Sequence, residues 1–294
     1  MPFGHTAYRA NALLPGSVPL EVSFSEATPE ALRFDVEPPA SADLGATRRR
    51  FAALMANSVG HYFGASLAAD FAARAEAAAG RADDQFALFV GCVCDHAGLT
   101  ELKAYYPLRR SPVPLAAAAR ATLPGLRDLM HAVSVRASGV ADRVYLVSTR
   151  QLDTLELEPL LCRFGLAHRL PELVMTIMRL TGNSFVLAPS SCVIGLREFG
   201  GNVELKVEIL LPGVVSRAAV DALGAMFADR PASQAAFRRW LDAVALPGAA
   251  TTPTVVSAKV SQQGGVRLTI YAHPVPKRPD TSADNERKLT PVLG

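Results

Sequence analysis

The chain has 294 residues, of which 50% are hydrophobic and 19% are charged, so it can bury a sizeable core and general disorder is excluded. Its 30 Lys and Arg residues against 27 Asp and Glu residues give a net charge of +3, which is too small to indicate binding to nucleic acid or to a membrane surface. No stretch of about 18 uninterrupted apolar residues is present, which excludes a transmembrane helix.

Five pairs of strand-like runs follow one another along the chain. The predicted pairs are Pro19–Ser25 with Ala31–Glu37, Phe86–Cys94 with Glu101–Tyr106, His131–Arg136 with Asp142–Val147, Ser191–Arg197 with Asn202–Leu211, and Thr254–Ser261 with Val266–Ala272. The gaps within the pairs are short and contain turn residues, such as Gly200-Gly201 and Gln263–Gly265. This pattern predicts five β-hairpins.

Helix-like runs rich in Ala, Leu and Arg follow every pair except the last. They cover Leu44–Ala79 with a break near Gly60–Gly64, Leu115–Leu129, Asp153–Arg163, Pro171–Leu180, Ser216–Asp229 and Ser233–Val244. The three arginines Arg48–Arg50 stand near the start of the first of these helices, and we interpret them as a solvated face.

The end of the chain differs in composition from the rest. Pro274 to Gly294 contains Pro, Lys, Arg, Asp and Ser with almost no aliphatic side chains, which predicts a disordered tail. No comparable linker divides the preceding residues. We therefore expect one domain over residues 1–273 and a tail over residues 274–294.

The five hairpins predict about ten antiparallel strands with helices on one face. Such a sheet exposes long edges unless it closes, and closure into a barrel removes them. The connections within the pairs are too short to hold crossover helices, which excludes the parallel barrel. We predict an α/β fold in which a closed, antiparallel, ten-stranded barrel is surrounded by a ring of helices.

In the second strand of each pair, apolar residues alternate with charged or phenolic ones. Because successive side chains on a strand point to opposite faces, the second set shares one face. Its members are Arg33, Asp35, Lys103, Tyr105, Arg143, Tyr145, Glu204, Lys206, Glu208, Arg267, Thr269 and Tyr271. One such strand is typical of the solvated face of an antiparallel sheet. Five strands in the same phase indicate instead that these side chains face the interior of the barrel.

The basic and phenolic residues of that face point to a chemical task. Buried cations are costly unless they are paired, so several of them in one chamber indicate an anionic ligand, and a diphosphate suits Arg and Lys geometry best. The tyrosine rings could stabilise a developing carbocation and keep water away from it. Glu21, on the polar phase of the first strand, could act as a general base, and we expect the surrounding cations to keep it ionised.

These residues resemble those of the aromatic prenyltransferases of the ABBA type, in particular the dimethylallyltryptophan synthase branch. The segments that carry the resemblance are Pro19–Ser23, Leu32–Pro38, Leu102–Tyr106, Asp142–Tyr145 and Val266–Pro274. The similarity extends from about Pro19 to Pro274, and the five hairpin units match the family's five αββα-type repeats, the PT barrel. The length is closer to that of the compact bacterial members.

The resemblance implies a role for each motif residue. Glu21 would bind the acceptor nitrogen as catalytic base. The diphosphate would be held by Arg33, Lys103, Arg143, Lys206 and Arg267, and the allyl cation would be shielded by Tyr105, Tyr145 and Tyr271. The fourth repeat departs from the family pattern, because Glu208 stands where a tyrosine is usual.

The implied reaction is a Friedel–Crafts alkylation, in which a dimethylallyl or longer prenyl group moves from an allylic diphosphate to an indole or tryptophan. Two alternatives stay open: a phenolic, naphthol or peptide acceptor, and a non-catalytic barrel that binds an anionic isoprenoid. We expect no required cofactor, because the cations could replace magnesium and the sequence lacks a DDxxD motif. Asp35, in the inward phase, could still recruit a metal ion.

The expected partners are small-molecule substrates only, without nucleic acid or membrane, for a monomer or homodimer in the cytoplasm. Residues 1–19 lack the basic and apolar regions of a signal peptide. The four cysteines have neither zinc-ligand spacing nor the pattern of a small secreted framework, which indicates reduced thiols.

Overall fold

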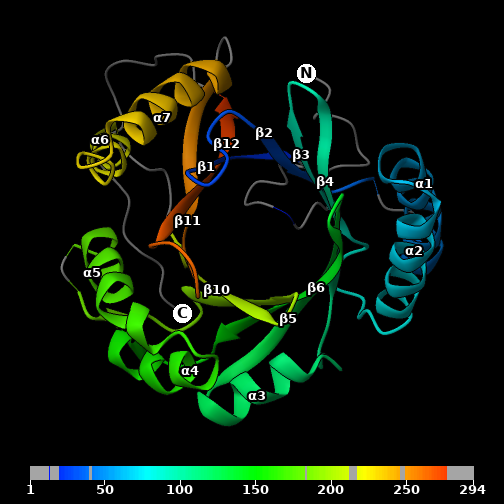
Figure 1. The fold of residues 1–294 in the computed structure, drawn as a ribbon, viewed down its shortest axis with the longest axis horizontal. Coiled ribbons are helices and arrows are strands. Elements are labelled where there is room, and N and C mark those ends of the chain that lie inside the picture. The colour runs from blue at the N-terminus through cyan, green and yellow to red at the C-terminus, as the bar shows by residue number, and fades with distance from the viewer. Residues whose placement is uncertain are drawn as a thin grey trace, which may run out of the picture.

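The computed structural model describes residues 13, 20–39, 42–182, 184–211, 217–245 and 249–276. Ten strands close into a barrel in the order β1-β12-β11-β10-β9-β6-β5-β4-β3-β2, and all neighbouring pairs are antiparallel (Figure 1). They are β1 Leu20–Ser25, β2 Leu32–Val36, β3 Phe89–Asp95, β4 Gly98–Pro107, β5 Leu126–Arg136, β6 Gly139–Ser148, β9 Cys192–Phe199, β10 Asn202–Leu210, β11 Ala249–Ser261 and β12 Arg267–Pro276. The predicted fold class is confirmed.

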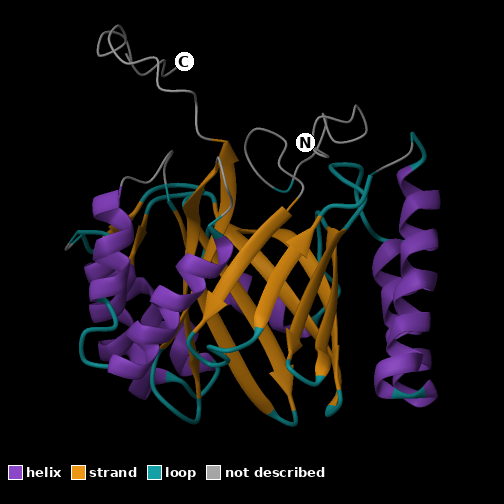
Figure 2. Ribbon diagram, turned by 90° about the horizontal axis from the view of Figure 1, so that it is seen from above, coloured by secondary structure: helices purple, strands orange, loops and turns teal. Residues whose placement is uncertain are grey.

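Helices surround the barrel and lie outside it (Figures 1 and 2). They are α1 Leu44–Phe63, α2 Ala65–Ala79, α3 Pro114–Thr122, α4 Leu157–Arg163, α5 Leu170–Leu180, α6 Arg217–Ala225 and α7 Pro231–Val244, with short 3-10 turns at Thr154–Glu156 and Ala167–Arg169. A two-stranded sheet of β7 Leu152–Asp153 and β8 Val186–Leu187, which the sequence pattern does not predict, lies outside the barrel order. The helix break is confirmed at Gly64.

The hydrophobic core lies between the barrel and its helices. On one side, outward strand residues such as Phe24 and Ile194 join helix residues such as Phe237 in one buried cluster. On the other side, Phe71 of α2 and Tyr106 of β4 belong to a second cluster, beneath α1 and α2. Each such side chain contributes roughly 1.5–3 kcal/mol when it is fully buried. The apolar phase of every strand therefore faces outward, and the polar phase must face the interior.

All five hairpin turns lie at one end of the barrel, and the helical connections reach its other end (Figure 2). The turn between β9 and β10 illustrates why the sequence folds this way. Gly200 and Gly201 both have positive φ, at 58° and 77°. A two-residue hairpin turn of the favoured hand needs this conformation at both positions, and glycine adopts it without steric cost.

Two sequence-based expectations about local structure are wrong. The helix expected to reach Leu129 ends at Thr122, and β5 begins at Leu126. Pro124 cannot donate a helical hydrogen bond, so the chain turns here and re-enters the barrel. The end of β12 at Pro276 also lies beyond residue 273, and the rest of the expected tail, 277–294, is outside the described residues.

The interpretation of Arg48 as part of a solvated face is also wrong. Its side chain is buried, and its guanidinium donates to the carbonyl oxygens of Ala87 at 2.8 Å, Phe86 at 2.7 Å and Asp83. Three carbonyl acceptors offset the cost of burying this charge. Arg48 therefore ties α1 to the segment that leads into β3, instead of facing solvent as Arg49 and Arg50 do.

Candidate functional site

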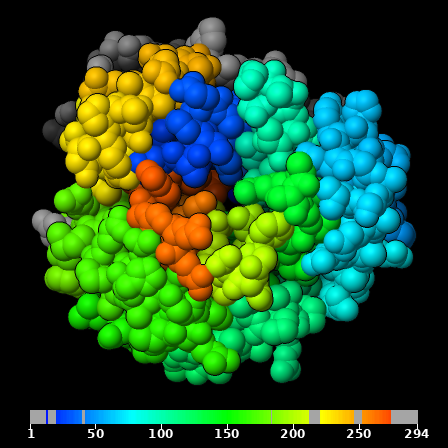
Figure 3. Space-filling model, viewed as in Figure 1, coloured from blue at the N-terminus to red at the C-terminus, as the bar shows by residue number. Residues whose placement is uncertain are grey.

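The inward face of the barrel carries a cluster of charged and phenolic side chains from nearly every strand. We call it the interior cluster. Its cationic members are Arg33, Lys103, Arg143, Arg197, Lys206 and Lys259, its carboxyl members are Glu21, Asp35, Glu101, Glu204 and Glu208, and its phenols are Tyr105, Tyr145 and Tyr271. Figure 3, which views the hairpin end, shows a hollow at the centre of this face, between the β1–β2 hairpin in blue and the β9–β10 hairpin in yellow-green.

Three of the residues predicted to hold a diphosphate lie in this cluster with carboxylate partners. Lys206 Nζ donates to Glu208 Oε1 at 2.6 Å, and Arg143 pairs with Glu204. Lys103 Nζ lies 3.5 Å from Glu101 Oε2. Neighbouring carboxylates therefore hold these cations in place.

Donor capacity nevertheless remains in the cluster. The Nε atoms of Arg33 and Arg197 are buried and have no hydrogen-bond acceptor among the residues that the structure describes. A buried donor without an acceptor costs about 1–3 kcal/mol, which an anionic ligand would recover. Arg33 also interacts electrostatically with Glu101 and Lys103, which places it beside the other cations.

Arg267 is not brought together with the other predicted diphosphate ligands. Its side chain is 48% exposed, and its Nη1 lies 3.6 Å from Glu26 Oε1. Glu26 also accepts from Arg230, just before α7, so it belongs to the outer layer and not to the interior. The inward phase predicted for β12 holds for Thr269 and Tyr271 but fails at Arg267, the first residue of the strand.

The sequence-based prediction missed two interior cations, Arg197 and Lys259. Arg197 lies 3.7 Å from Glu101 and 3.2 Å from Glu204, and Lys259 Nζ lies 3.2 Å from Glu204. Both cations belong to the first strands of their hairpins, whereas the prediction followed the second strands. Alternation along β9 could have identified Arg197. It shares a phase with Val193 and Gly195, and the residues of the other phase are buried and pack outward.

Two of the predicted tyrosines, Tyr145 and Tyr271, lie around Lys206, and Tyr105 packs against Tyr145. The ring centroids of Tyr105 and Tyr145 are 5.9 Å apart. The Lys206 ammonium lies 5.9 Å from the centre of the Tyr145 ring and 5.3 Å from that of Tyr271, whose hydroxyl also accepts from it at 2.8 Å. The rings of Tyr145 and Tyr271 already present their faces to a cation, which is the arrangement that cation–π stabilisation requires.

Glu21 and Asp35 form a pair of carboxyl groups on β1 and β2, beside these tyrosines. They are direct partners in the β1–β2 register, and Thr254 Oγ1 donates to Glu21 Oε1 at 3.0 Å. Burial, together with the charges of Asp35 and Glu208, raises the pKa of Glu21 to about 8. The expectation that cations keep Glu21 ionised is therefore wrong, because desolvation outweighs the effect of Lys206 on its pKa.

Burial also moves the pKa of Lys103, in the opposite direction. Desolvation, with repulsion from Arg33 and Arg143, lowers it to about 8, although Glu101 and Asp35 act the other way. A dianionic ligand beside Lys103 would raise its pKa again. The cluster is thus electrostatically prepared for additional negative charge near Lys103.

Sites of other kinds are not found in the described part of the chain. None of its groups of His, Cys, Asp or Glu side chains could hold a metal ion with three or more ligands. No helix within the described ranges is long and apolar enough to cross a membrane. The four cysteines are free thiols.

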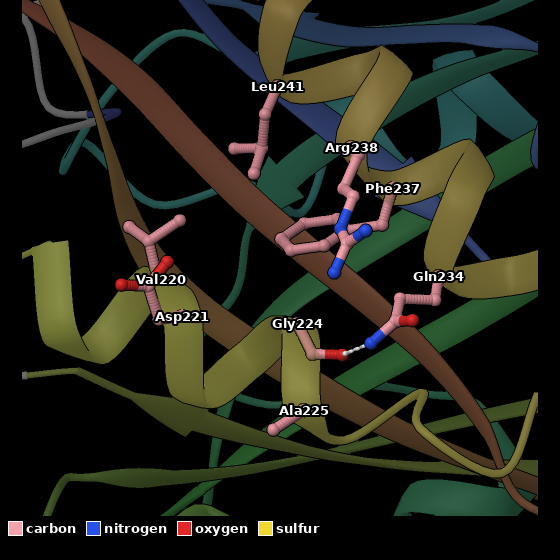
Figure 4. Close-up of a pocket in the computed structure, with 8 residues that line it drawn as sticks. All are labelled: Val220, Asp221, Gly224, Ala225, Gln234, Phe237, Arg238 and Leu241. Carbon is pink, nitrogen blue, oxygen red and sulfur yellow. Dashed lines mark hydrogen bonds between the residues drawn. The ribbon is translucent and has the colours of Figure 1, made fainter. Parts of the chain in front are cut away.

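A second hollow, of about 260 Å³, lies outside the barrel between α6 and α7 (Figure 4). Gln234 of α7 donates to the carbonyl oxygen of Gly224 across it at 3.2 Å, and Phe237 and Leu241 supply apolar walls. None of the predicted site residues lines it, and its two charged side chains, Asp221 and Arg238, are of opposite sign.

Comparison with known proteins identifies the fold. No model of a known protein family matches the sequence, and no curated protein does. Several solved structures are similar, and three of them illustrate the likeness. The match to 6-dimethylallyltryptophan synthase from Micromonospora olivasterospora, in complex with DMASPP and Trp, has a TM-score of 0.67 and 19% identity, and covers 90% of this chain and 84% of that one.

The other two structures also share the fold at low sequence identity. For 5-dimethylallyl tryptophan synthase from Streptomyces coelicolor, also with DMASPP and Trp, the TM-score is 0.61 at 14% identity, over 97% of this chain and 87% of that one. For AnaPT from Neosartorya fischeri the TM-score is 0.64 at 15% identity, and the match covers 94% of this chain and 83% of that one. At such identities the likeness establishes a shared fold, and the resemblance deduced from the sequence motifs is confirmed at that level.

Proposed function

We propose that this protein is an aromatic prenyltransferase that transfers a dimethylallyl or longer prenyl group from an allylic diphosphate to an electron-rich arene, with an indole such as tryptophan as the first candidate acceptor. The observation that carries the proposal is the interior cluster, which combines cations, tyrosine ring faces and a buried glutamate in one closed barrel. The shared fold adds support, because two of the similar structures contain DMASPP and Trp.

The diphosphate would be bound by Lys103, Arg143 and Lys206, with Arg33 and the additional cation Arg197 supplying donors that lack acceptors. Arg267 is left out of this set. Positive charge placed in advance around the leaving group lowers the barrier to ionisation of the allylic C–O bond. The closed barrel wall excludes water from the cation that forms, and Tyr105, Tyr145 and Tyr271 surround it.

Glu21 would accept a hydrogen bond from the ring N–H of the acceptor and so make the ring more nucleophilic. A pKa of about 8 suits this task, since a general base works best when its pKa is close to the working pH. The ring carbon then attacks the allyl cation, and one C–C bond replaces the broken C–O bond. We propose that magnesium is not essential, because side-chain cations face the leaving group.

We also propose a cellular compartment and a set of partners for this protein. We place the reaction in the cytoplasm, which the free thiols support. The partners would be the two small-molecule substrates, with no nucleic acid or membrane, and the protein would be a monomer or homodimer.

The test is a product assay. The protein is incubated with dimethylallyl or geranyl diphosphate and with tryptophan, an indole-containing peptide or dihydroxynaphthalene, with and without EDTA. We expect an acceptor that has gained one prenyl group, with a yield that EDTA does not change. Product from dihydroxynaphthalene or the peptide alone would favour the alternative acceptors, and no product from any combination would contradict the proposal.

Substitutions separate an enzyme from a barrel that merely binds an isoprenoid. Lys103→Met should weaken binding of inorganic diphosphate in calorimetry, whereas Arg109→Met, at a side chain that is 86% exposed, should leave it unchanged. Glu21→Ala should abolish turnover and keep diphosphate affinity. A protein that binds diphosphate but shows no turnover to lose would be the non-catalytic alternative.

A further inference from the structure

Asp35 is an interior carboxyl group to which the mechanism above gives no task. It stands opposite Glu21 in the β1–β2 register and opposite Gly91 in the β2–β3 register. Its Oδ1 is buried, and no described donor hydrogen-bonds to it. A buried carboxyl oxygen without a donor costs free energy, so an acceptor function is its most direct explanation.

The neighbouring strand leaves room for this carboxyl group. A Cβ at position 91 would lie 2.2 Å from Asp35 Oδ1 and 3.1 Å from a ring carbon of Tyr105. Glycine at 91 thus allows the carboxyl group and the phenol ring to lie against the backbone of β3. As a result, Asp35 sits between Glu21, which would hold the acceptor, and Tyr105, which would face the allyl cation.

The reaction itself requires one more acceptor of a proton. When the allyl cation joins the ring, the attacked carbon still holds its hydrogen and the ring carries the positive charge. That C–H bond must break, its electron pair must return to the ring, and the proton must go to a base. Water is a poor candidate inside a closed barrel that protects a carbocation.

We propose that Asp35 is a catalytic residue that accepts this ring proton through Oδ1, an inference that rests on the proposed function. Asp35 has a hydrogen bond with Tyr105, but its Oδ1 has no donor among the described residues, whereas most of the other interior carboxylates bind cations. Glu204 binds Arg143, Arg197 and Lys259, and Glu208 binds Lys206. Glu101 binds Arg136 at 2.9 Å, while Glu21 is held by Thr254 and hydrogen-bonds the acceptor N–H.

The electrostatic environment agrees with this role. Burial raises the pKa of Asp35, while Lys103, Arg33, Lys206 and a hydrogen bond with Tyr105 act to lower it. A carboxyl group with a raised pKa holds a proton more firmly than an exposed aspartate does. The proton taken from the ring leaves Asp35 for water when the products depart.

The test compares Asp35→Asn with the wild type, using tryptophan deuterated at all five carbon-bound positions of the indole ring, so the attachment position need not be known. In the wild type we expect turnover without a primary isotope effect, because loss of the proton follows the slow ionisation. In Asp35→Asn we expect turnover to fall roughly 10²-fold and a primary isotope effect to appear, because proton removal becomes limiting. Asp95→Asn, the same change at the exposed last residue of β3, should alter neither quantity.

A second variant distinguishes the loss of proton acceptance from a folding defect. Asp35→Ala removes the carboxyl group and leaves space, so added formate should restore part of its turnover if the lost function is proton acceptance. A lower turnover without an isotope effect and without formate rescue, or an unchanged turnover, would overturn the role of Asp35 while leaving the proposed function intact. A wild type that forms no prenylated product would overturn the proposed function and this inference together.

Discussion

Glu21 shows how a single residue can be unfavourable for stability and favourable for function. Its carboxyl group is buried beside Asp35 and Glu208, and this environment raises its pKa from 4.5 to about 8. The folded protein therefore binds the Glu21 proton more tightly than the unfolded chain does. This contribution to stability is fully present below pH 4.5 and is lost as the pH rises through about 8.

Glu21 should therefore make the free energy of unfolding decrease as the pH rises. Each pKa unit corresponds to about 1.4 kcal/mol, so ionisation of Glu21 should lower the free energy of unfolding by roughly 3 kcal/mol or more between pH 5 and pH 9. Glu21→Gln cannot ionise and should lack this decrease, although its turnover should be lost. Urea unfolding of both proteins at the two pH values measures the difference, and equal pH dependence would show that Glu21 ionises normally in the fold.

At the scale of the element, the interior surface depends on small residues as much as on charged ones. Gly91→Ala should push Asp35 and the Tyr105 ring out of place, because the new Cβ would lie 2.2 Å from Asp35 Oδ1. We expect a loss of about 1–3 kcal/mol in stability and a larger loss of turnover. Gly60→Ala, within α1 and at an ordinary 3.6 Å from Ala68, should instead stabilise by about 0.5–1 kcal/mol. Equal behaviour of the two variants in urea unfolding and turnover would contradict this account.

The strand pattern also explains what could be predicted from the sequence. Alternation identifies the inward phase wherever the outward phase is apolar, which is why Lys103, Arg143 and Lys206 were placed correctly. Arg267 begins its strand, where a long side chain can turn to a nearby carboxylate such as Glu26. The pairing of the cations with Glu101, and the pKa of Glu21, depend on distances across the barrel that alternation does not encode.

At the scale of the whole molecule, the barrel closes only when the first strand pairs with the last. Glu26 lies at this seam with its side chain 0% exposed. Arg230 donates to both of its oxygens, at 2.6 and 2.7 Å, and the backbone N–H of Leu268 donates to Oε2 at 3.2 Å. One carboxylate thus joins the end of β1, the start of β12 and the outer helical layer.

Glu26→Ala should therefore reduce the free energy of unfolding by about 3 kcal/mol, because it leaves the Arg230 guanidinium and a buried N–H without their acceptor. Glu30→Ala in the same hairpin removes an ion pair with Arg239, at a side chain that is 75% exposed, and should cost less than about 1 kcal/mol. Denaturant unfolding of the two variants gives the comparison. A cost for Glu26→Ala no greater than that for Glu30→Ala would show that the seam does not depend on this carboxylate.

The position of a bound diphosphate tests the central claim most directly. A crystal structure of the protein with DMASPP should show the diphosphate oxygens inside the barrel, in contact with Lys103, Arg143 and Lys206, and the prenyl chain beside Tyr145 and Tyr271. Density for the ligand outside the barrel, for example in the hollow between α6 and α7, or an interior that stays free of ligand at saturating DMASPP, would contradict the account.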